Sequence, residues 1–354
     1  MTSFAFKNYS ACKRHIFRSI ALCFAILLSG GAVIAADFLV IAHRGASGYL
    51  PEHTREAKVA AYFSGADFLE QDVVLSKDGV PMVIHDLYLD ATTDVANIYP
   101  GRSRADGRFY AIDFSLSELK QLKVRERVDL KTGNQTFPNR FPGDDPGFGI
   151  STLEEEIQLI QGMNASTGRN VGLYAEIKAP HFHAKEGKDL SKAVLDVLDQ
   201  YGYTDAEAAI YIQSFDFNEI KRLRMELGYK GKLVQLLGEN RWNIAPDTDY
   251  EYLKSKEGLR ELAMLVDGIG PWIGQLVEEG DTGGKPATTG LAEAARDAGL
   301  AVHAYTLRSD RLPDWASDFD VLLEIAFSDL ALDGAFTDFP DKMVAFRQRK
   351  AGNR

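Results

Sequence analysis

The sequence is poor in cysteine and, past its first residues, in long apolar runs. Its only two cysteines, Cys12 and Cys23, both lie in the first 36 residues. A mature chain without that segment has no thiol, which excludes a disulfide framework, a cysteine-based metal site and a cysteine nucleophile. After residue 36, no apolar run approaches the roughly 20 residues that a membrane span requires.

Positive charge is also in deficit. The chain has 40 lysines and arginines against 51 aspartates and glutamates, and its formal net charge is -11. Such a protein lacks the sequence-independent attraction to phosphate that drives nucleic-acid binding, so we expect no nucleic acid among its partners. A small anionic substrate would need local positive charge or a bound metal. The hydrophobic content of 45% excludes a disordered chain and is ample for a core.

Residues 1–36 differ in composition from the rest. Four basic residues and no acid occupy residues 1–18, an apolar run follows at 20–28, and small residues lead to Ala36. This order is typical of a cleaved secretory signal peptide. We therefore expect a mature periplasmic chain from Asp37 onward, with a net charge of -15 after loss of the four basic residues and without a stable membrane anchor. An uncleaved anchor is the alternative, and the short apolar run disfavours it.

From residue 37, short runs rich in Val, Ile, Phe and Tyr alternate with helical patterns, which is typical of βα units and a parallel sheet. Strands are predicted at 38–43, 68–75, 171–177, 209–215, 232–237, 268–272, 301–307 and 334–337, and helices at 53–64, 153–161, 190–201, 218–227, 259–265 and 290–298. Eight such units favour one α/β domain over 37–350, a (β/α)8 TIM barrel with its active site at the carboxyl ends of the strands. A doubly wound open sheet is the alternative, but the segment at 43–48 lacks the GxGxxG pattern.

The alternation is interrupted after the second strand. Residues 76–79 leave no room for a crossover helix before the apolar run at 80–84, so we predict a β-hairpin on an Asp78-Gly79 turn. With Lys77 opposite Val80, Asp72 would face His85. Residues 87–150 are too long for a plain loop and predict a small inserted subdomain on the active-site side, with a short helix at 117–122.

Chemically active side chains gather at three predicted strand ends. In chain order they are His43, Arg44, Glu70, Asp72, His85, Glu176 and Lys178. Three carboxylates provide the oxygen ligands that suit a hard cation such as Ca²⁺ or Mg²⁺. Two histidines can act as general acid and base near neutral pH, and the two cationic side chains can neutralise a phosphoryl group. The pattern indicates a hydrolytic site.

Five motifs occur in order at these strand ends. They are Ile41-Ala42-His43-Arg44-Gly45-Ala46, Pro51-Glu52, Leu69-Glu70-Gln71-Asp72-Val73, Val83-Ile84-His85-Asp86 and Ala175-Glu176-Ile177-Lys178. In order and spacing they resemble the motifs of the glycerophosphodiester phosphodiesterases. Further segments, at 106–114, 177–180, 213–215, 308–310 and 336–340, are similar to the bacterial periplasmic branch of that family. The resemblance extends from Asp37 nearly to the end of the chain.

The resemblance implies a TIM barrel of the phospholipase C-like phosphodiesterase type with an inserted subdomain. It implies that Glu70, Asp72 and Glu176 bind a divalent cation, usually Ca²⁺, with Mg²⁺ as the alternative. It also assigns His43 and His85 as the acid and base, with Arg44 and Lys178 on the phosphate; these seven residues are the implied site.

The activity implied is hydrolysis of glycerophosphodiesters, such as glycerophosphocholine, glycerophosphoethanolamine and glycerophosphoglycerol, to sn-glycerol 3-phosphate and an alcohol. Attack by the glycerol 2-hydroxyl through a cyclic phosphate and direct attack by water both remain open, as does the preferred headgroup. One residue departs from the family pattern: many members read Pro-Glu-Asn-Thr where this chain has Pro51-Glu52-His53-Thr54, which leaves only the role of position 53 in question.

Other residues have two interpretations each. Lys178 could pair with Glu176 instead of phosphate, and Glu52 could support its neighbours or contact metal or substrate directly. Four residues at later strand ends could line the glycerol side of the pocket or merely pack: Gln213, Phe215, Trp272 and Tyr305.

The remaining histidines have weaker claims to a site. His181 and His183 suggest a metal pair, because residues two apart share a strand face, but a loop at the mouth of the site is favoured. His53 and His303 are expected to be structural or to support the site from behind.

Two other functions fit the sequence less well. A phospholipase acting on intact lipids would need an apolar rim or a basic patch for a membrane surface, and the polar insertion disfavours it. A catalytically idle binding barrel would be expected to lack one of the five central histidines and carboxylates, and all five are present. The sequence leaves the oligomeric state open, a homodimer included.

Overall fold

The computed structural model describes residues 38–142, 147–278 and 286–352. The predicted signal peptide and both cysteines lie outside these residues. Within them, no helix combines the length and apolar character needed to cross a membrane.

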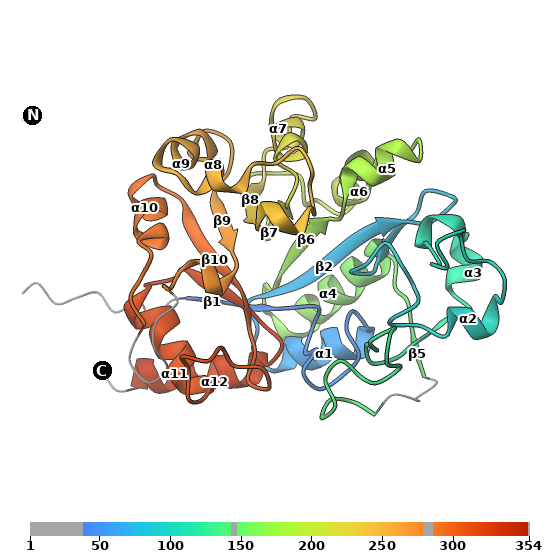
Figure 1. The fold of residues 1–354 in the computed structure, drawn as a ribbon, viewed down its shortest axis with the longest axis horizontal. Helices are drawn as coiled ribbons and strands as arrows, with labels where there is room; N and C mark the ends of the chain where they lie inside the picture. Colours follow the sequence, from blue (N-terminus) through green and yellow to red (C-terminus); the bar gives the residue numbers. More distant parts are fainter. Residues whose placement is uncertain (1–37, 143–146, 279–285, 353–354) are drawn as a thin grey trace, which may run out of the picture. The chain divides into compact units, whose positions relative to one another are not determined.

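Eight parallel strands close into a barrel, which confirms the predicted fold class (Figure 1). In chain order they are β1 (Leu39–Ala42), β2 (Phe68–Leu75), β6 (Gly172–Ile177), β7 (Ile210–Ser214), β8 (Lys232–Leu237), β9 (Gly268–Pro271), β10 (Ala301–Leu307) and β11 (Gly334–Thr337). Strand β1 pairs with β2 on one side and with β11 on the other, and this closes the sheet. Each predicted strand is present, with ends that differ by one residue or less.

Helices surround the strands (Figure 1). The six predicted helices are α1 (Arg55–Phe63), α4 (Leu153–Thr167), α6 (Leu190–Gln200), α7 (Phe217–Met225), α9 (Lys256–Ala263) and α10 (Leu291–Asp297). Among the described residues, four further helices outside the insertion differ from the prediction by being present: α5 (Pro180–Lys185), α8 (Tyr250–Lys254), α11 (Phe319–Glu324) and α12 (Pro340–Gly352). Short 3-10 turns η2 (Asn240–Trp242) and η3 (Ile273–Gln275) follow β8 and β9, and a π-helical turn η4 (Ile325–Asp329) follows α11.

Two apolar layers hold the barrel together. Between strands and helices, aliphatic side chains form one large core cluster. Inside the barrel, a smaller cluster of Ile41, Tyr174, Tyr211, Val234 and Phe336 fills the interior. The barrel is therefore a packed core below the site rather than a channel.

The hairpin after β2 forms with a different register from the one predicted. Strand β3 (Pro81–Val83) pairs antiparallel with β2, and Val73 lies opposite Val83. The turn is one residue longer than expected: Ser76 pairs with Val80, and Gly79 takes a φ of 83° at the end of a three-residue loop. The backbone partner of Asp72 is therefore Ile84 instead of His85.

The insertion has its own small core. It contains α2 (Val95–Ile98), the 3-10 turn η1 (Ala111–Asp113), α3 (Leu116–Leu119), and the two-stranded sheet of β4 (Lys123–Val124) and β5 (Phe148–Gly149). Helix α3 starts one residue before the predicted helix at 117–122 and is shorter, because Ser115 and Glu118 form a capping box that sets its start. Twelve buried apolar residues, Phe114 and Leu119 among them, pack together beside β2 and β3.

Candidate active site

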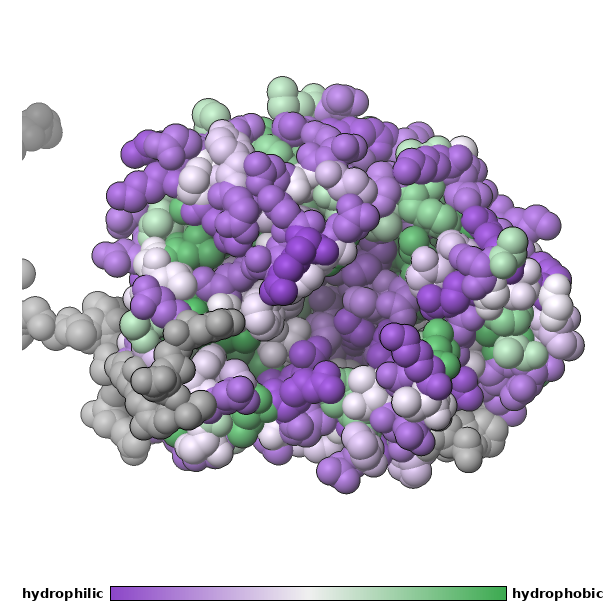
Figure 2. Space-filling model, viewed as in Figure 1, coloured by the Kyte–Doolittle hydropathy of each residue, from purple (hydrophilic) through white to green (hydrophobic). Residues whose placement is uncertain are grey.

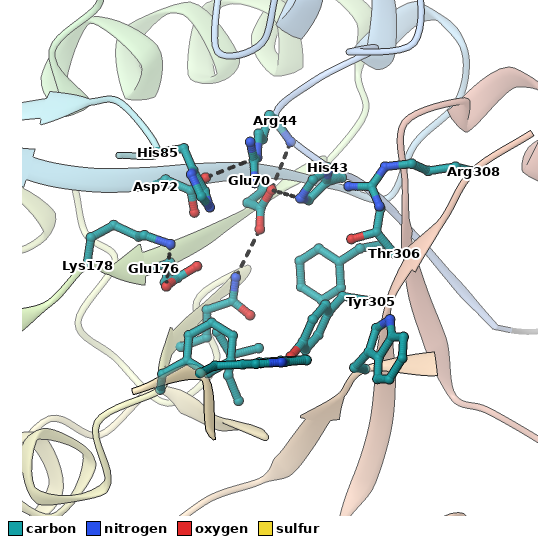
Figure 3. Close-up of a pocket in the computed structure, with 16 residues that line it drawn as sticks. His43, Arg44, Glu70, Asp72, His85, Glu176, Lys178, Tyr305, Thr306 and Arg308 are labelled. Carbon is teal, nitrogen blue, oxygen red and sulfur yellow. Dashed lines mark hydrogen bonds and ion pairs between the residues drawn. The ribbon is translucent and has the colours of Figure 1, made fainter. Parts of the chain in front are cut away.

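A cavity of about 310 Å³ lies at the carboxyl ends of the barrel strands. All seven residues of the predicted site line it: His43, Arg44, Glu70, Asp72, His85, Glu176 and Lys178. Figure 2 shows a hollow with hydrophilic walls in the middle of the face it views, and Figure 3 shows the labelled side chains converging from separate strands. The fold thus collects residues that lie up to 135 positions apart in sequence, from His43 to Lys178.

Three carboxylates form a buried cluster. Glu70 and Asp72 project from the same face of β2, since side chains alternate along a strand, and the β2–β6 register sets Asp72 beside Glu176. One oxygen from each lies within 4.8 Å of the others. The three residues are only 1–5% exposed.

The electrostatics of this cluster favour a bound cation. Burial, together with repulsion by Asp72, raises the pKa of Glu70 well above its usual value. Burial raises the pKa of Glu176 to about 8, against the lowering effect of Lys178. Burial alone would also raise the pKa of Asp72, but Lys178 and His53 hold it well below its usual value. Glu70 and Glu176 are thus costly to ionise in the protein alone.

An unpartnered oxygen supports the same conclusion. Oδ1 of Asp72 is buried and accepts no hydrogen bond in the described structure. A hard divalent cation held by Glu70, Asp72 and Glu176 would satisfy this oxygen and offset the repulsion. Within the described ranges, no other group of histidines, cysteines or acids comes close enough to form such a set.

His43 is held by a carboxylate from the far end of the chain. Its Nδ1 lies 2.6 Å from Oδ1 of Asp338, which directly follows β11, and its Nε2 lies 3.9 Å from Oε2 of Glu70. Strand β11 is adjacent to β1 because the barrel closes there. Asp338 is not among the residues predicted for the site, although an acid directly after the last strand is a signal that the sequence contains.

His85 reaches the cavity although the predicted register is wrong. Strand β3 ends at Val83, and the backbone N–H of Ile84 still donates to the carbonyl oxygen of Asp72. His85, which follows Ile84, lies beyond the residues of β3 that pair with β2, so its side chain can line the cavity. The Nδ1 of His85 lies 2.5 Å from Oδ1 of Asp86.

Both histidines are neutral at physiological pH. Burial and the neighbouring Arg44 lower the pKa of His43 to about 4, although Asp338 opposes the shift. Burial, Arg44 and Lys178 likewise lower the pKa of His85 to about 4. In a neutral imidazole whose Nδ1–H donates to a carboxylate, Nε2 keeps its lone pair. Each ring can therefore accept a proton at Nε2.

The two cationic residues contact the carboxylates directly. Nζ of Lys178 lies 2.8 Å from Oε1 of Glu176, and Nε of Arg44 lies 3.5 Å from Oδ2 of Asp72. The backbone N–H of Arg44 donates to Glu70. Lys178 thus pairs with Glu176 and also lines the cavity, so the two interpretations of this residue are compatible.

Glu52 and Gln213 form hydrogen bonds with residues of the site. Glu52 accepts hydrogen bonds from Arg44 and from Arg127 of the insertion, and it lies outside the carboxylate cluster. Nε2 of Gln213 donates to Oε1 of Glu70 at 3.1 Å. These contacts favour a supporting role for both side chains.

Four aromatic side chains form part of the cavity wall, which we call the aromatic wall. The predicted Phe215, Trp272 and Tyr305 line the cavity, and Trp242, from the unpredicted turn η2, joins them. The rings contact each other edge to face, Phe215 against Tyr305 and Trp242 against Trp272. This wall suits an uncharged, partly apolar group.

His53, the departure from the family pattern, contacts the carboxylate cluster. Its Nε2 lies 2.7 Å from Oδ2 of Asp72, and its Nδ1 lies 3.2 Å from Nζ of the fully buried Lys58. Lys58 in turn pairs with Glu156 on α4. From the sequence, His53 is expected to be structural or to support the site, because no residue near it in sequence indicates these contacts.

The other histidines lie away from the cluster. His181 and His183 were expected on a loop at the mouth of the site, but they lie on helix α5, and neither lines the cavity. Nε2 of His183 accepts from the backbone N–H of Leu75, so this ring is structural. His303 lies inside the barrel, where its Nδ1 contacts the hydroxyl of Tyr174, consistent with the structural role expected of it.

Comparison with known proteins matches residues 43–342 to the family described as "Glycerophosphoryl diester phosphodiesterase family". A glycerophosphodiester phosphodiesterase of Haemophilus influenzae is 42% identical over 329 residues, which cover 88% of this chain and 90% of the relative. One of Treponema pallidum is 38% identical over 344 residues, covering 93% of this chain and 96% of the relative.

The fold has a counterpart among solved structures. A phosphodiesterase of Oleispira antarctica, solved in complex with the product sn-glycerol-3-phosphate, superposes with a TM-score of 0.58 at 23% identity. The superposition covers 87% of this chain and 96% of that one.

Proposed function

Because this chain belongs to the glycerophosphoryl diester phosphodiesterase family, whose activity is hydrolysis of glycerophosphodiesters, we propose that it releases sn-glycerol 3-phosphate from soluble substrates with the aid of Ca²⁺. The substrates are esters such as glycerophosphocholine, glycerophosphoethanolamine and glycerophosphoglycerol. His43 and His85 are the acid and base, and the enzyme works in the periplasm.

One observation carries the proposal. Two neutral histidines, each held at Nδ1 by a carboxylate, lie beside a buried cluster of three further carboxylates in one cavity. Once one ring has taken a proton from solvent, such a pair can remove a proton from the entering oxygen and protonate the leaving oxygen. The curated relatives, which carry the same activity in their names, support the reaction.

The residues of the site have different roles in the proposed reaction. Arg44 and Lys178 attract the phosphate and neutralise part of its charge. The imidazole that acts as base takes a proton at Nε2 from the attacking hydroxyl or water. The imidazole that acts as acid must first take a proton from solvent at Nε2, and it then gives this proton to the departing alcohol. Asp338 and Asp86 keep each ring oriented with Nε2 available and stabilise the imidazolium after it accepts a proton.

Glu70, Asp72 and Glu176 are the residues that would hold the cation, which when bound neutralises the cluster and polarises a phosphate oxygen. All three ligands are carboxylates, a choice that favours Ca²⁺ or Mg²⁺ over a softer metal. The acidic cluster alone would repel an anionic ester, so turnover should depend on the ion.

Export to the periplasm rests on residues 1–36, whose basic start, apolar centre and small residues are those of a signal peptide. Cell fractionation of the expressed full chain tests it. The expected result is a shortened protein in the osmotic-shock fraction; a full-length protein in the membrane fraction would indicate an uncleaved anchor.

The decisive experiment measures release of glycerol 3-phosphate from glycerophosphocholine by the purified protein with Ca²⁺ or with a chelator. We expect turnover in Ca²⁺ only, and a loss of at least about 100-fold in His43→Ala and His85→Ala. His181→Ala is the matched control, because this ring is partly exposed and lies outside the cavity.

The activity, the metal requirement and the acid and base assignment can each be refuted separately. No turnover in Ca²⁺ refutes the activity, and full turnover in chelator refutes the metal requirement. Undiminished turnover in both alanine variants refutes the acid and base assignment. Faster cleavage of intact phosphatidylcholine vesicles than of glycerophosphocholine would indicate a phospholipase-type phosphodiesterase instead.

A further inference from the structure

A second cavity of about 260 Å³ adjoins the first and shares one wall with it. His43, Arg44, His85 and Arg308 line both cavities. In Figure 3, Arg308 lies beyond His43, on the side away from Lys178. If the phosphate lies at this shared wall, between the two histidines, its two ester substituents extend into different cavities. We call the first the aromatic lobe and the second the basic lobe.

The two lobes differ in chemistry. The aromatic lobe is lined by Phe215, Trp242, Trp272 and Tyr305. Besides the shared wall, the basic lobe is lined by Arg127, Thr136, Phe137 and Arg140 from the insertion, by Arg311 from the segment after β10, and by Ser47, Glu52 and Asp338. Both acids are paired with arginines, Glu52 with Arg44 and Arg127, and Asp338 with Arg140 and Arg308. An uncharged glycerol gains little from arginines and can lie against aromatic rings, so the aromatic lobe suits glycerol and the basic lobe suits the departing alcohol.

Two of these arginines, Arg127 and Arg140, already donate most of their hydrogen bonds to carboxylates of the protein. Arg127 donates to Glu52 through two nitrogens and to Asp86 through the third. Arg140 donates to Asp310 and to Asp338, and its side chain is only 5% exposed. These guanidinium groups hold the insertion against the barrel and have few donors left for a ligand.

The other two arginines of the basic lobe, Arg308 and Arg311, have N–H groups that donate to no described residue. Arg308 contacts Asp338 through Nε only, which leaves its two terminal nitrogens without a hydrogen bond in the described chain. Arg311 is exposed and has neither an ion pair nor a hydrogen bond to any described residue. Its guanidinium carbon lies 4.8 Å from the centre of the Phe137 ring, which Arg140 also contacts, at 3.6 Å. Arg311 is thus placed by an aromatic contact and keeps its N–H groups available.

We propose that the basic lobe receives the departing alcohol, and that Arg311, with the free edge of Arg308, binds an anionic group on it. The preferred substrates are then glycerophosphodiesters whose headgroup carries a second negative charge, either a carboxylate or a second phosphate. A guanidinium group can bind both anions through paired hydrogen bonds. This inference rests on the proposed function and adds the headgroup class to it.

The test compares two substrates that differ by one carboxylate, glycerophosphoserine and glycerophosphoethanolamine. The readout is the ratio of their kcat/KM values, which does not depend on the fraction of folded enzyme. We expect the serine ester to be preferred, and Arg311→Ala to reduce the ratio about tenfold, mainly through KM, as for a partly exposed charged hydrogen bond. Arg311→Lys should restore part of it. The exposed Arg260 on α9 is the control, and Arg260→Ala should leave the ratio unchanged.

A second pair of substrates distinguishes the two anions. Bis(glycerophospho)glycerol, compared with glycerophosphoglycerol, tests for a second phosphate in the same variants. A reduced ratio in either pair supports the inference and identifies the anion. Unchanged ratios in both pairs, or an equal fall for every substrate, would overturn it. If the unaltered protein cleaves none of these esters, the proposed function fails, and the inference falls with it.

Discussion

At the scale of single residues, Asp72 is held on one side and open on the other. Its Oδ2 accepts from His53 and lies near Arg44, whereas Oδ1 has no partner in the described structure. One oxygen is therefore fixed by the protein, and the other is available to a cation. A hydrogen bond to a ligating carboxylate orients it for the metal.

His53 should accordingly affect metal affinity. We expect His53→Ala to weaken Ca²⁺ binding by about tenfold, because Asp72 loses the bond that orients it. Calorimetric titration of the chelator-treated protein measures this without reference to turnover. His181→Ala should bind Ca²⁺ normally. Equal affinities in the unaltered protein and His53→Ala would show that Asp72 does not need this support.

Glu126 should destabilise the protein at alkaline pH. This residue of the insertion is 4% exposed, and its Oε2 has no hydrogen-bond partner among the described residues. Burial raises its pKa to about 7, although Arg140 opposes the shift. Between pH 4.5 and 7 the folded protein keeps a proton that the unfolded chain has lost, so stability falls as pH rises through this range.

Replacing Glu126 by Gln removes that penalty. In chelator, the free energy of unfolding of Glu126→Gln should exceed that of the unaltered protein by up to about 3 kcal/mol at pH 8, and by less than about 1 kcal/mol at pH 5. Urea denaturation at the two pH values measures the difference. The exposed Glu257→Gln should show no such dependence. A gain at pH 5 as large as at pH 8 would contradict the mechanism.

At the scale of elements, the β2–β3 turn sets the position of His85. The turn needs Gly79, whose φ is 83° and whose added Cβ would meet no atom within 4 Å. Gly162 within α4 is equally free of neighbours but has a helical backbone. The same substitution should therefore act in opposite directions at the two sites.

We expect Gly79→Ala to lower the free energy of unfolding by about 1 kcal/mol, the cost of a left-handed backbone for alanine. Gly162→Ala should raise it by about 1 kcal/mol, because alanine favours the helix. Both are read from urea denaturation of the purified variants. A destabilised Gly162→Ala, or an unaffected Gly79→Ala, would show that backbone conformation does not govern these sites.

The same turn shows why the predicted register was wrong. Sequence patterns located the hairpin, but an Asp-Gly pair fits a two-residue turn as well as the end of a three-residue loop. The longer loop is held by contacts outside the hairpin, such as the bond from Leu116 N–H to Asp78 and the bond from Lys77 N–H to the carbonyl of Phe114. Those residues belong to the insertion, which local sequence reasoning could not place.

At the scale of the whole molecule, a net charge of -11 includes three acids that the fold concentrates at one point. Binding an ion there should stabilise the protein. At 100 times the dissociation constant the gain is about 2.7 kcal/mol, which should raise Tm by roughly 5 °C in a domain of this size. Thermal denaturation with Ca²⁺ and with chelator measures it.

Replacing one of the three carboxylates should stabilise the metal-free protein and abolish its stabilisation by Ca²⁺. Glu70→Gln should have a higher Tm than the unaltered protein in chelator, because a buried acid with a raised pKa is lost. It should also lose the Ca²⁺-induced increase, whereas the exposed Glu257→Gln should keep it. An unchanged Ca²⁺ effect in Glu70→Gln would show that the ion binds elsewhere.

The barrel, the ends of its strands to within one residue and the seven residues of the predicted site all follow from the sequence. Burial of a parallel strand requires a short apolar run, and the chemistry of a site requires particular side chains at the ends of such runs. Both signals extend over only a few neighbouring residues. They are therefore present in the chain before it folds.

The contacts that these residues make follow only from the way the chain folds. His43 meets Asp338 because β1 and β11 close the barrel across 295 positions, and Arg311 meets Phe137 because the insertion packs over the segment after β10. His53 likewise reaches Asp72 through packing of α1 against β2. Such contacts depend on how whole elements pack, and no local pattern in the sequence encodes that packing.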